Sequence, residues 1–317
     1  MNSIPTMNRR ERFLAAVGGR AVDRPPTVAW VHFLSDHLPG DETARLHLEF
    51  LRAYNWDVAK LMNDYRYPVP HGLELLDSAE AMRRFKPLSL DERSFAEQLR
   101  AIECLRRELG PEWPILDTLF DPCQQVLRNV GFNQAVALPQ HRDAALEMLD
   151  AVTDTLCRYV AAARNAGADG FFLSINGAIQ SGFPRGGDAD TFRDFQRPFD
   201  LRLLDAAKGT VRVLHVHGVG LDLDRVIDYP CEVFSVSDRL QGNPSLAELR
   251  RRTDRCLMGG LDESRLHDRT LPEVRAEVDD ALAQAGRERL ILAPGCTLPS
   301  FSPQRTLQNL REYTLTI

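Results

Sequence analysis

The sequence predicts a single-domain α/β protein with the (β/α)8 TIM-barrel fold. The chain has 317 residues, which lies in the size range of one such barrel. Short apolar runs alternate with longer segments of helical period, and no Gly-x-Gly-x-x-Gly motif follows the first run, which disfavours an open doubly wound sheet. We therefore expect residues 1–317 to form one barrel, with an N-terminal arm and a longer excursion at about 63–113 that partly covers the barrel mouth.

Eight runs rich in β-branched and aromatic residues are the expected strands. Most of them are continuously apolar, which is typical of parallel strands covered on both faces. They are 27–33, 57–63, 114–120, 168–174, 211–217, 231–237, 256–262 and 289–296.

Segments with an apolar stripe of helical period lie between these runs. In the longest of them Gly167 follows the last apolar position and is well placed as a C-cap, and three prolines stand near helix starts, where the missing N–H costs nothing. The expected helices are 44–54, 95–110, 142–167, 189–209, 244–253, 271–286 and 302–314.

Composition limits the classes of partner and the compartment. The formal charge of −6 leaves no broad basic face, so we expect a small-molecule substrate rather than nucleic acid or a membrane surface. Six scattered cysteines without a close pair, no secretory signal and no apolar run of about 18 residues indicate a cytoplasmic protein. The sequence is compatible with a homodimer but does not specify an oligomeric state.

Polar residues follow most of the expected strands, and in a barrel these ends meet at the active site. Single polar residues at strand ends mean little, but their convergence on one rim is informative. Among them are Asn63, Asp64, Tyr65, Asn176, Gln180, His215, His217, Asp238, Arg239 and Cys296.

His215 and His217 are the most informative of these residues. They are two positions apart, so on a strand both side chains leave the same face. Cys296 ends another expected strand, and two imidazoles with one thiolate form a three-ligand zinc set with a fourth position open. The alternative is that the histidines are hydrogen-bonded rim residues and Cys296 fills the core.

Several short motifs, in order along nearly the whole chain, resemble the uroporphyrinogen decarboxylase superfamily, which includes zinc-dependent methyltransferases. They are NRRERFLAAVGGRAVDRPPT at the start, AGADGFFLS (166–174), HVHG (215–218), GGLD (259–262) and LAPGC (292–296). The resemblance implies a (β/α)8 barrel.

Two branches of the superfamily differ in their motifs. The true decarboxylase carries Arg-Gln-Ala-Gly-Arg-Tyr after the first strand, where this chain reads VHFLSDHLPG (31–40) without arginine, so uroporphyrinogen is not expected as a substrate. The methyltransferase branch carries His-x-Cys and a later Gly-Cys that bind Zn²⁺, and this chain matches with His215 and Cys296 but has His217 at the middle position. This resemblance implies a zinc-dependent methyltransferase acting on a thiol, with a corrinoid methyl-carrier protein as partner.

The histidine at position 217 leaves two further functions open. Two imidazoles and one thiolate give bound zinc one net positive charge, which weakens a bound thiolate as nucleophile and favours a bound oxygen ligand. A decarboxylase, or a zinc-assisted lyase or hydrolase acting on a small carboxylated metabolite, is therefore the alternative, with Asp64, Asp238 and Arg239 as acid, base or carboxylate anchor. Substrate contacts are expected from Asn63, Tyr65, Asn176, Gln180 and Arg239, and a non-catalytic binding protein is the third hypothesis.

Overall fold

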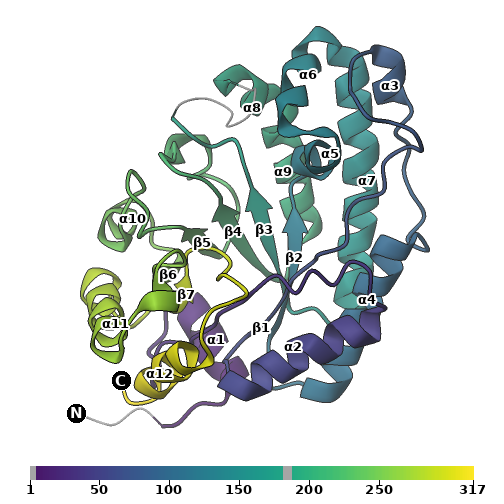
Figure 1. Ribbon diagram of the computed structural model, residues 1–317. Coiled ribbons are helices and arrows are strands. Elements are labelled where there is room, and N and C mark those ends of the chain that lie inside the picture. Colours follow the sequence, from purple (N-terminus) through teal and green to yellow (C-terminus); the bar gives the residue numbers. More distant parts are fainter. Residues whose placement is uncertain (1–4, 181–187) are drawn as a thin grey trace.

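The computed structural model describes residues 5–180 and 188–317, and in these ranges seven strands form one parallel sheet in chain order. The sheet is curled, and helices surround its outer face (Figure 1). The strands are β1 (Ala59–Leu61), β2 (Ile115–Phe120), β3 (Gly170–Ile175), β4 (Val211–Val216), β5 (Val233–Val236), β6 (Cys256–Leu261) and β7 (Leu290–Pro294).

The helices follow the expected segments, with additions. The expected segment 189–209 divides into α8 and α9 at Gln196, and α1, α3, α5 and α6 are helices that periodicity did not single out. The described helices are α1 (Arg9–Val17), α2 (Gly40–Tyr54), α3 (Ala79–Arg83), α4 (Arg93–Leu109), α5 (Pro122–Val130), α6 (Ala137–Gln140), α7 (Arg142–Ala166), α8 (Ala189–Phe195), α9 (Arg197–Ala206), α10 (Leu246–Arg252), α11 (Leu271–Ala285) and α12 (Gln304–Thr314). None of the helices in the described ranges has the length and apolar character needed to cross a bilayer.

The first expected strand, 27–33, is not a ladder strand. It is an extended segment with isolated parallel bridges from Thr27 to Leu292 and from Val31 to Leu298, and the Thr27 carbonyl accepts one hydrogen bond from the Asp57 N–H, two residues before β1. The Thr27 N–H donates to the side chain of Asp57 rather than to a strand, whereas the Val28 N–H donates to the Leu292 carbonyl of β7. The expected parallel α/β sheet is therefore confirmed as a curled sheet with seven strands in the described ranges. The eighth expected strand is not confirmed, and in its place an extended segment lies in contact with β7 and the residues before β1.

Alternation along the strands builds the interior. One buried cluster joins α1, through Phe13 and Ala16, to inward-facing strand residues such as Val213, Met258 and Ile291. Helix α1 lies at the amino ends of the strands (Figure 1), so it seals that end of the sheet. Polar side chains lie at the opposite end, where the strands stop.

The Asp-Arg-Pro-Pro motif anchors α1 and the first extended segment. Asp23 accepts two hydrogen bonds from Arg12 of α1, at 2.7 Å each. Arg24 donates to both oxygens of the fully buried Asp57, at 2.6 and 2.7 Å. Burial of these charges is tolerated because each is paired in good geometry.

Candidate functional site

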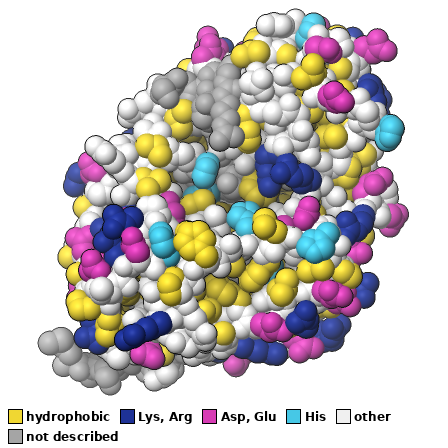
Figure 2. Space-filling view, viewed as in Figure 1, with side chains coloured by type: hydrophobic (Ala, Val, Ile, Leu, Met, Phe, Trp, Pro, Cys, Tyr) yellow, Lys and Arg dark blue, Asp and Glu magenta, His cyan; other side chains and the backbone are white. Residues whose placement is uncertain are grey.

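A cavity of about 430 Å³ lies at the carboxyl ends of the strands, and Figure 2 shows this face hollowed, with histidine and basic side chains at its edge. The strand residues that line the cavity alternate in step with the inward-facing core residues of the same strands. The cavity therefore continues the interior of the sheet at its carboxyl end. The described lining residues are Trp30, His32, Lys60, Met62, Thr118, Phe120, Gln124, Arg128, Phe132, Phe172, Ser174, Asn176, His215, His217, Gly218, Cys296 and Thr297.

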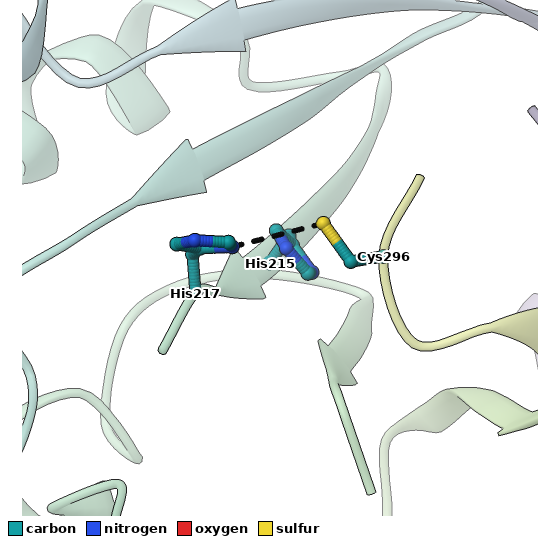
Figure 3. A group of neighbouring side chains, drawn as sticks. All are labelled: His215, His217 and Cys296. Atoms are coloured by element: carbon teal, nitrogen blue, oxygen red, sulfur yellow. Dashed lines mark hydrogen bonds between the residues drawn. The ribbon is translucent and has the colours of Figure 1, made fainter. Parts of the chain in front are cut away.

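His215, His217 and Cys296 meet in this cavity. One potential ligand atom from each residue lies within 4.8 Å of the others. Figure 3 shows the two imidazoles projecting from the end of β4 and the thiol facing them from the segment after β7. The expectation that both histidines leave one face of a strand and that Cys296 opposes them is thus met by the geometry.

His215 is held as a neutral imidazole. Burial lowers its pKa well below the ordinary value, and His217 and Lys60 lower it further. Its Nδ1 lies 3.3 Å from Ser235 Oγ and its ring stacks on Phe172 at 5.0 Å between centroids. The buried Nε2 has no hydrogen-bond partner among the described residues, so a nitrogen lone pair is left for a ligand.

Cys296 reaches the cavity because a glycine precedes it. A Cβ at position 295 would lie 2.5 Å from Ser237 Cα and 2.8 Å from Glu263 Oε2, so only glycine lets this backbone approach β5 so closely. The Cys296 Sγ lies 3.7 Å from His217 Nδ1. Burial raises the pKa of the thiol to about 11, and a bound cation would reverse that shift.

This donor set fits zinc. Two imidazole nitrogens and one sulfur are the ligands that zinc prefers, and three protein ligands leave a fourth position for substrate. The orphaned, buried His215 Nε2 is the observation that distinguishes this group from an ordinary hydrogen-bonded rim.

Of the other predicted site residues, one lines the cavity and six do not. Asn176 lines the cavity. The remaining six do not line it: Asn63, Asp64, Tyr65, Gln180, Asp238 and Arg239.

Two of these residues, Asp238 and Arg239, connect elements below the rim. Asp238 Oδ1 accepts the Gly260 N–H at 2.8 Å, and burial raises the pKa of this carboxyl to about 6. Arg239 donates to the Gly260 carbonyl at 2.9 Å and pairs with Asp280 of α11. Asp238 therefore joins the end of β5 to β6, and Arg239 joins it to both β6 and α11.

Tyr65 and Gln180 also have other contacts. The Tyr65 hydroxyl donates to the Leu38 carbonyl at 2.9 Å, in keeping with loop packing. The Gln180 amide donates to the Leu221 carbonyl at 3.5 Å. The described lining residues include none from 63–113; α5 instead contributes Gln124 and Arg128.

Lys60 is the main lining residue that sequence reasoning missed. Its ammonium lies 2.9 Å from Thr118 Oγ1 and over the rings of Trp30 and Phe172, at 4.7 and 4.2 Å. Burial lowers its pKa to about 7. The sequence contained a signal for this residue. Lys60 lies inside the apolar run DVAKLMN, two positions before Met62, so both side chains are expected on the same face of the strand.

Comparisons with known proteins were made on both sequence and structure. Residues 62–315 match the family model described as uroporphyrinogen decarboxylase (URO-D). A comparison with curated proteins found no match.

Several solved structures share the fold. A methyltransferase from Methanosarcina mazei is 20% identical over 98% of this chain and 99% of its own, with a TM-score of 0.75. A B12-independent methionine synthase from Shewanella sp. W3-18-1 is 14% identical over 92% and 94%, with a TM-score of 0.61. A putative vitamin-B12 independent methionine synthase from Listeria monocytogenes is 14% identical over 87% and 85%, with a TM-score of 0.57. These likenesses establish the fold, and the family match, which covers most of the chain, establishes that this protein belongs to the uroporphyrinogen decarboxylase (URO-D) family.

Proposed function

We propose that this protein is a zinc-dependent methyltransferase that activates a thiol at a site formed by His215, His217 and Cys296. The observation that carries the proposal is the approach of one potential ligand atom from each of the three residues to within 4.8 Å inside a cavity. The buried His215 Nε2, which has no hydrogen-bond partner among the described residues, adds to it. When bound, zinc would supply a Lewis acid that lowers the pKa of a thiol. The fold shared with a methyltransferase adds support, as analogy.

The cavity favours a small substrate that carries an anionic group. Its described lining contains the cations Lys60 and Arg128 but no aspartate or glutamate. Lys60 lies deep, and the buried Nη1 of Arg128 has no partner among the described residues. Uncompensated positive charge in a low-dielectric cavity attracts anions. A corrinoid methyl-carrier protein is the proposed methyl donor, and it would dock on the open face at the carboxyl ends of the strands.

The charge of the ligand set supports a second candidate. With His217 in place of a second thiolate, bound zinc would keep one net positive charge, which favours an oxygen ligand over a thiolate nucleophile. This chemistry would make the protein a lyase, hydrolase or decarboxylase acting on a small carboxylated metabolite. The cationic lining suits such a substrate equally well.

Metal analysis tests the site. We expect purified protein to hold about one zinc per chain and Cys296→Ala to lose most of it, because two imidazoles alone form a weak, incomplete set. Cys157→Ala is the matched control, since Cys157 is a half-buried thiol outside the cavity. Equal zinc in wild type and Cys296→Ala would contradict the assignment.

Methyl transfer is then assayed directly. Zinc-loaded protein is mixed with free methylcobalamin and a series of small thiols, and loss of the methylcobalamin absorbance is followed. We expect transfer with wild type and Cys157→Ala and none with Cys296→Ala. Full zinc occupancy without transfer to any thiol would favour the lyase or hydrolase candidate.

A further inference from the structure

His32 and Asp64 form a pair beside the proposed metal site. His32 follows the extended segment Thr27–Val31, and its half-exposed side chain lines the same cavity as His215, His217 and Cys296. Its Nδ1 lies 2.6 Å from Asp64 Oδ1. The imidazole therefore connects the cavity to a carboxylate behind it.

Asp64 is fixed in place and kept away from the cavity. Its side chain is only 5% exposed, and its Oδ2 accepts hydrogen bonds from the backbone N–H and the hydroxyl of Ser35, at 3.2 and 3.3 Å. Burial alone would raise the pKa of this carboxyl, but the hydrogen bond and charge of His32 and the Ser35 N–H lower it below its ordinary value. An ionised Asp64 accepts the Nδ1 proton of His32, which leaves the Nε2 lone pair for another partner.

We propose that His32 is the proton acceptor for the substrate thiol and that Asp64 is the residue that positions it; this inference rests on the thiol chemistry proposed above. The S–H bond of the substrate breaks, its proton forms a bond to His32 Nε2, and the electron pair stays on sulfur. After methyl transfer and product release the imidazolium returns the proton to solvent.

The charges around the cavity explain why the acceptor needs a carboxylate. Lys60 from β1 and Arg128 from α5 line the same cavity, and no described carboxylate does, so an imidazolium there would face only cations. Asp64 supplies negative charge from behind the ring. Besides His32, the charged or titratable groups that interact with Asp64 are Lys60, Arg128, Tyr65 and the buried His47. The other two lining histidines are assigned to the metal, so His32 is the remaining imidazole base.

Cobalt-substituted protein allows proton acceptance to be measured without turnover. The probe is 2-mercaptoethanol, and its binding as a thiolate is followed by stopped-flow absorbance of the cobalt–sulfur charge-transfer band at neutral pH. We expect His32→Gln to slow this binding by about 10²-fold or more, the usual contribution of a positioned base. Asp64→Asn should slow it by a smaller factor, with unchanged cobalt content in both variants. Added imidazole should restore part of the rate in His32→Ala.

The chain offers a matched control pair five residues away. His37 and Asp36 also lie close together, at 3.9 Å, but both side chains are exposed and outside the cavity. His37→Gln and Asp36→Asn should bind the thiol at the wild-type rate. A wild-type rate in His32→Gln, with its cobalt content intact, would overturn the role of His32.

A second measurement separates this inference from the proposed function. In metal-free protein labelled with ¹⁵N-histidine, NMR should show His32, identified by its loss in His32→Gln, as the tautomer protonated at Nδ1, and Asp64→Asn should change that state. The Nε2-protonated tautomer in wild type would overturn the pairing. If wild-type cobalt protein binds no thiol while NMR shows the expected tautomer, the thiol chemistry has failed and the pair itself stands.

Discussion

At the scale of single residues, the cavity holds ionisable side chains whose pKa values are shifted by burial, which disfavours their charged forms. Lys60 is 4% exposed and, among the described residues, has no carboxylate within ion-pair distance. The Cys296 thiol and the His215 imidazole are held in their neutral forms by burial. Buried ionisable side chains of this kind destabilise the fold. They are found at functional sites, where a bound cation or anion stabilises their charged form.

Lys60→Met should stabilise the metal-free protein. Burial lowers the pKa of Lys60 to about 7 from its ordinary value of 10.5. Between these two values the unfolded chain binds more protons than the folded one, so the free energy of unfolding rises with pH there. The cost of the charged lysine is therefore complete below pH 7 and lost near pH 10.5. We expect a gain of about 1–3 kcal/mol in the free energy of unfolding at pH 6 that fades by pH 10.

Urea denaturation across this pH range measures the effect. Lys86→Met, at an exposed lysine, is the control and should change stability little at any pH. A gain that is independent of pH would show that the effect comes from packing rather than from the charge.

His217→Cys decides between the two proposed chemistries. It would change the ligand set to one histidine and two thiolates, which makes bound zinc neutral and richer in electron density. A methyl transfer to thiol should keep or gain rate with unchanged pH dependence. An oxygen ligand should instead show a higher pKa, so activity at neutral pH would fall and the pH–rate profile would move to higher pH. The measurement is a pH–rate profile of both proteins at equal zinc content.

At the scale of elements, the site depends on how each strand is entered from the preceding helix. Helix α7 ends at Gly167, as predicted, with φ at 116° in the left-handed region, and β3 begins three residues later. Arg106 of α4 donates to the Gly167 carbonyl at 2.9 Å and pairs with Asp169, which fixes this turn. Strand β3 then carries Phe172 and Ser174 into the cavity.

Gly167→Ala should destabilise the protein by about 2–3 kcal/mol, because it adds strain at a positive φ and a clash. The new Cβ would lie 2.8 Å from Arg106 Cγ, and Arg106 can move only by giving up its contacts with the turn. Gly209→Ala is the control, since its φ is +87° but its Cβ would meet only Arg164 Nη2, at 3.7 Å. Thermal unfolding should show a smaller loss for Gly209→Ala, of about 1 kcal/mol; equal losses would mean that Arg106 adjusts freely.

At the scale of the whole molecule, one buried carboxylate joins distant parts of the chain. Asp57, fully buried before β1, accepts hydrogen bonds from Arg12 of α1, Arg24 of the first loop and Arg311 of α12. Burial would raise the pKa of Asp57, but the hydrogen bonds and charges of Arg24 and Arg311 lower it to about 2. This cluster ties both ends of the chain to the base of the sheet.

Asp57→Asn should cost about 3–5 kcal/mol, because it leaves the buried Arg24 and Arg311 without their carboxylate and removes one of the two carboxylates that pair with Arg12. In wild type the contribution is present above pH 3.8 and is lost as pH falls through about 2. Chemical denaturation at pH 7 and pH 3 checks both statements. Asp41→Asn, which breaks an exposed pair with Arg100 at 3.1 Å, should change stability by less than about 1 kcal/mol; equal losses in both variants would contradict the role of the buried cluster.

Much of the fold and the core of the site was readable from the sequence, because those signals are local. Seven of the eight expected strands lie where their apolar runs are, since a continuous run needs only its own residues to be recognised as a buried parallel strand. His215 and His217 share a face because alternation along a strand is set by the backbone. Cys296 was expected opposite them because it ends another expected strand, and the order of short motifs pointed to the same residue.

Tertiary structure decided which rim residues enter the cavity. Asn176 does, whereas Asp238 and Arg239 turn to β6 and α11, because the direction of a side chain after a strand depends on which neighbours offer it hydrogen bonds. In the run 27–33 the Thr27 N–H donates to the side chain of Asp57 rather than to a strand, and Asp64 has His32 of the same run as its partner. These pairings join residues about 30 positions apart, and no pattern within a single segment records them.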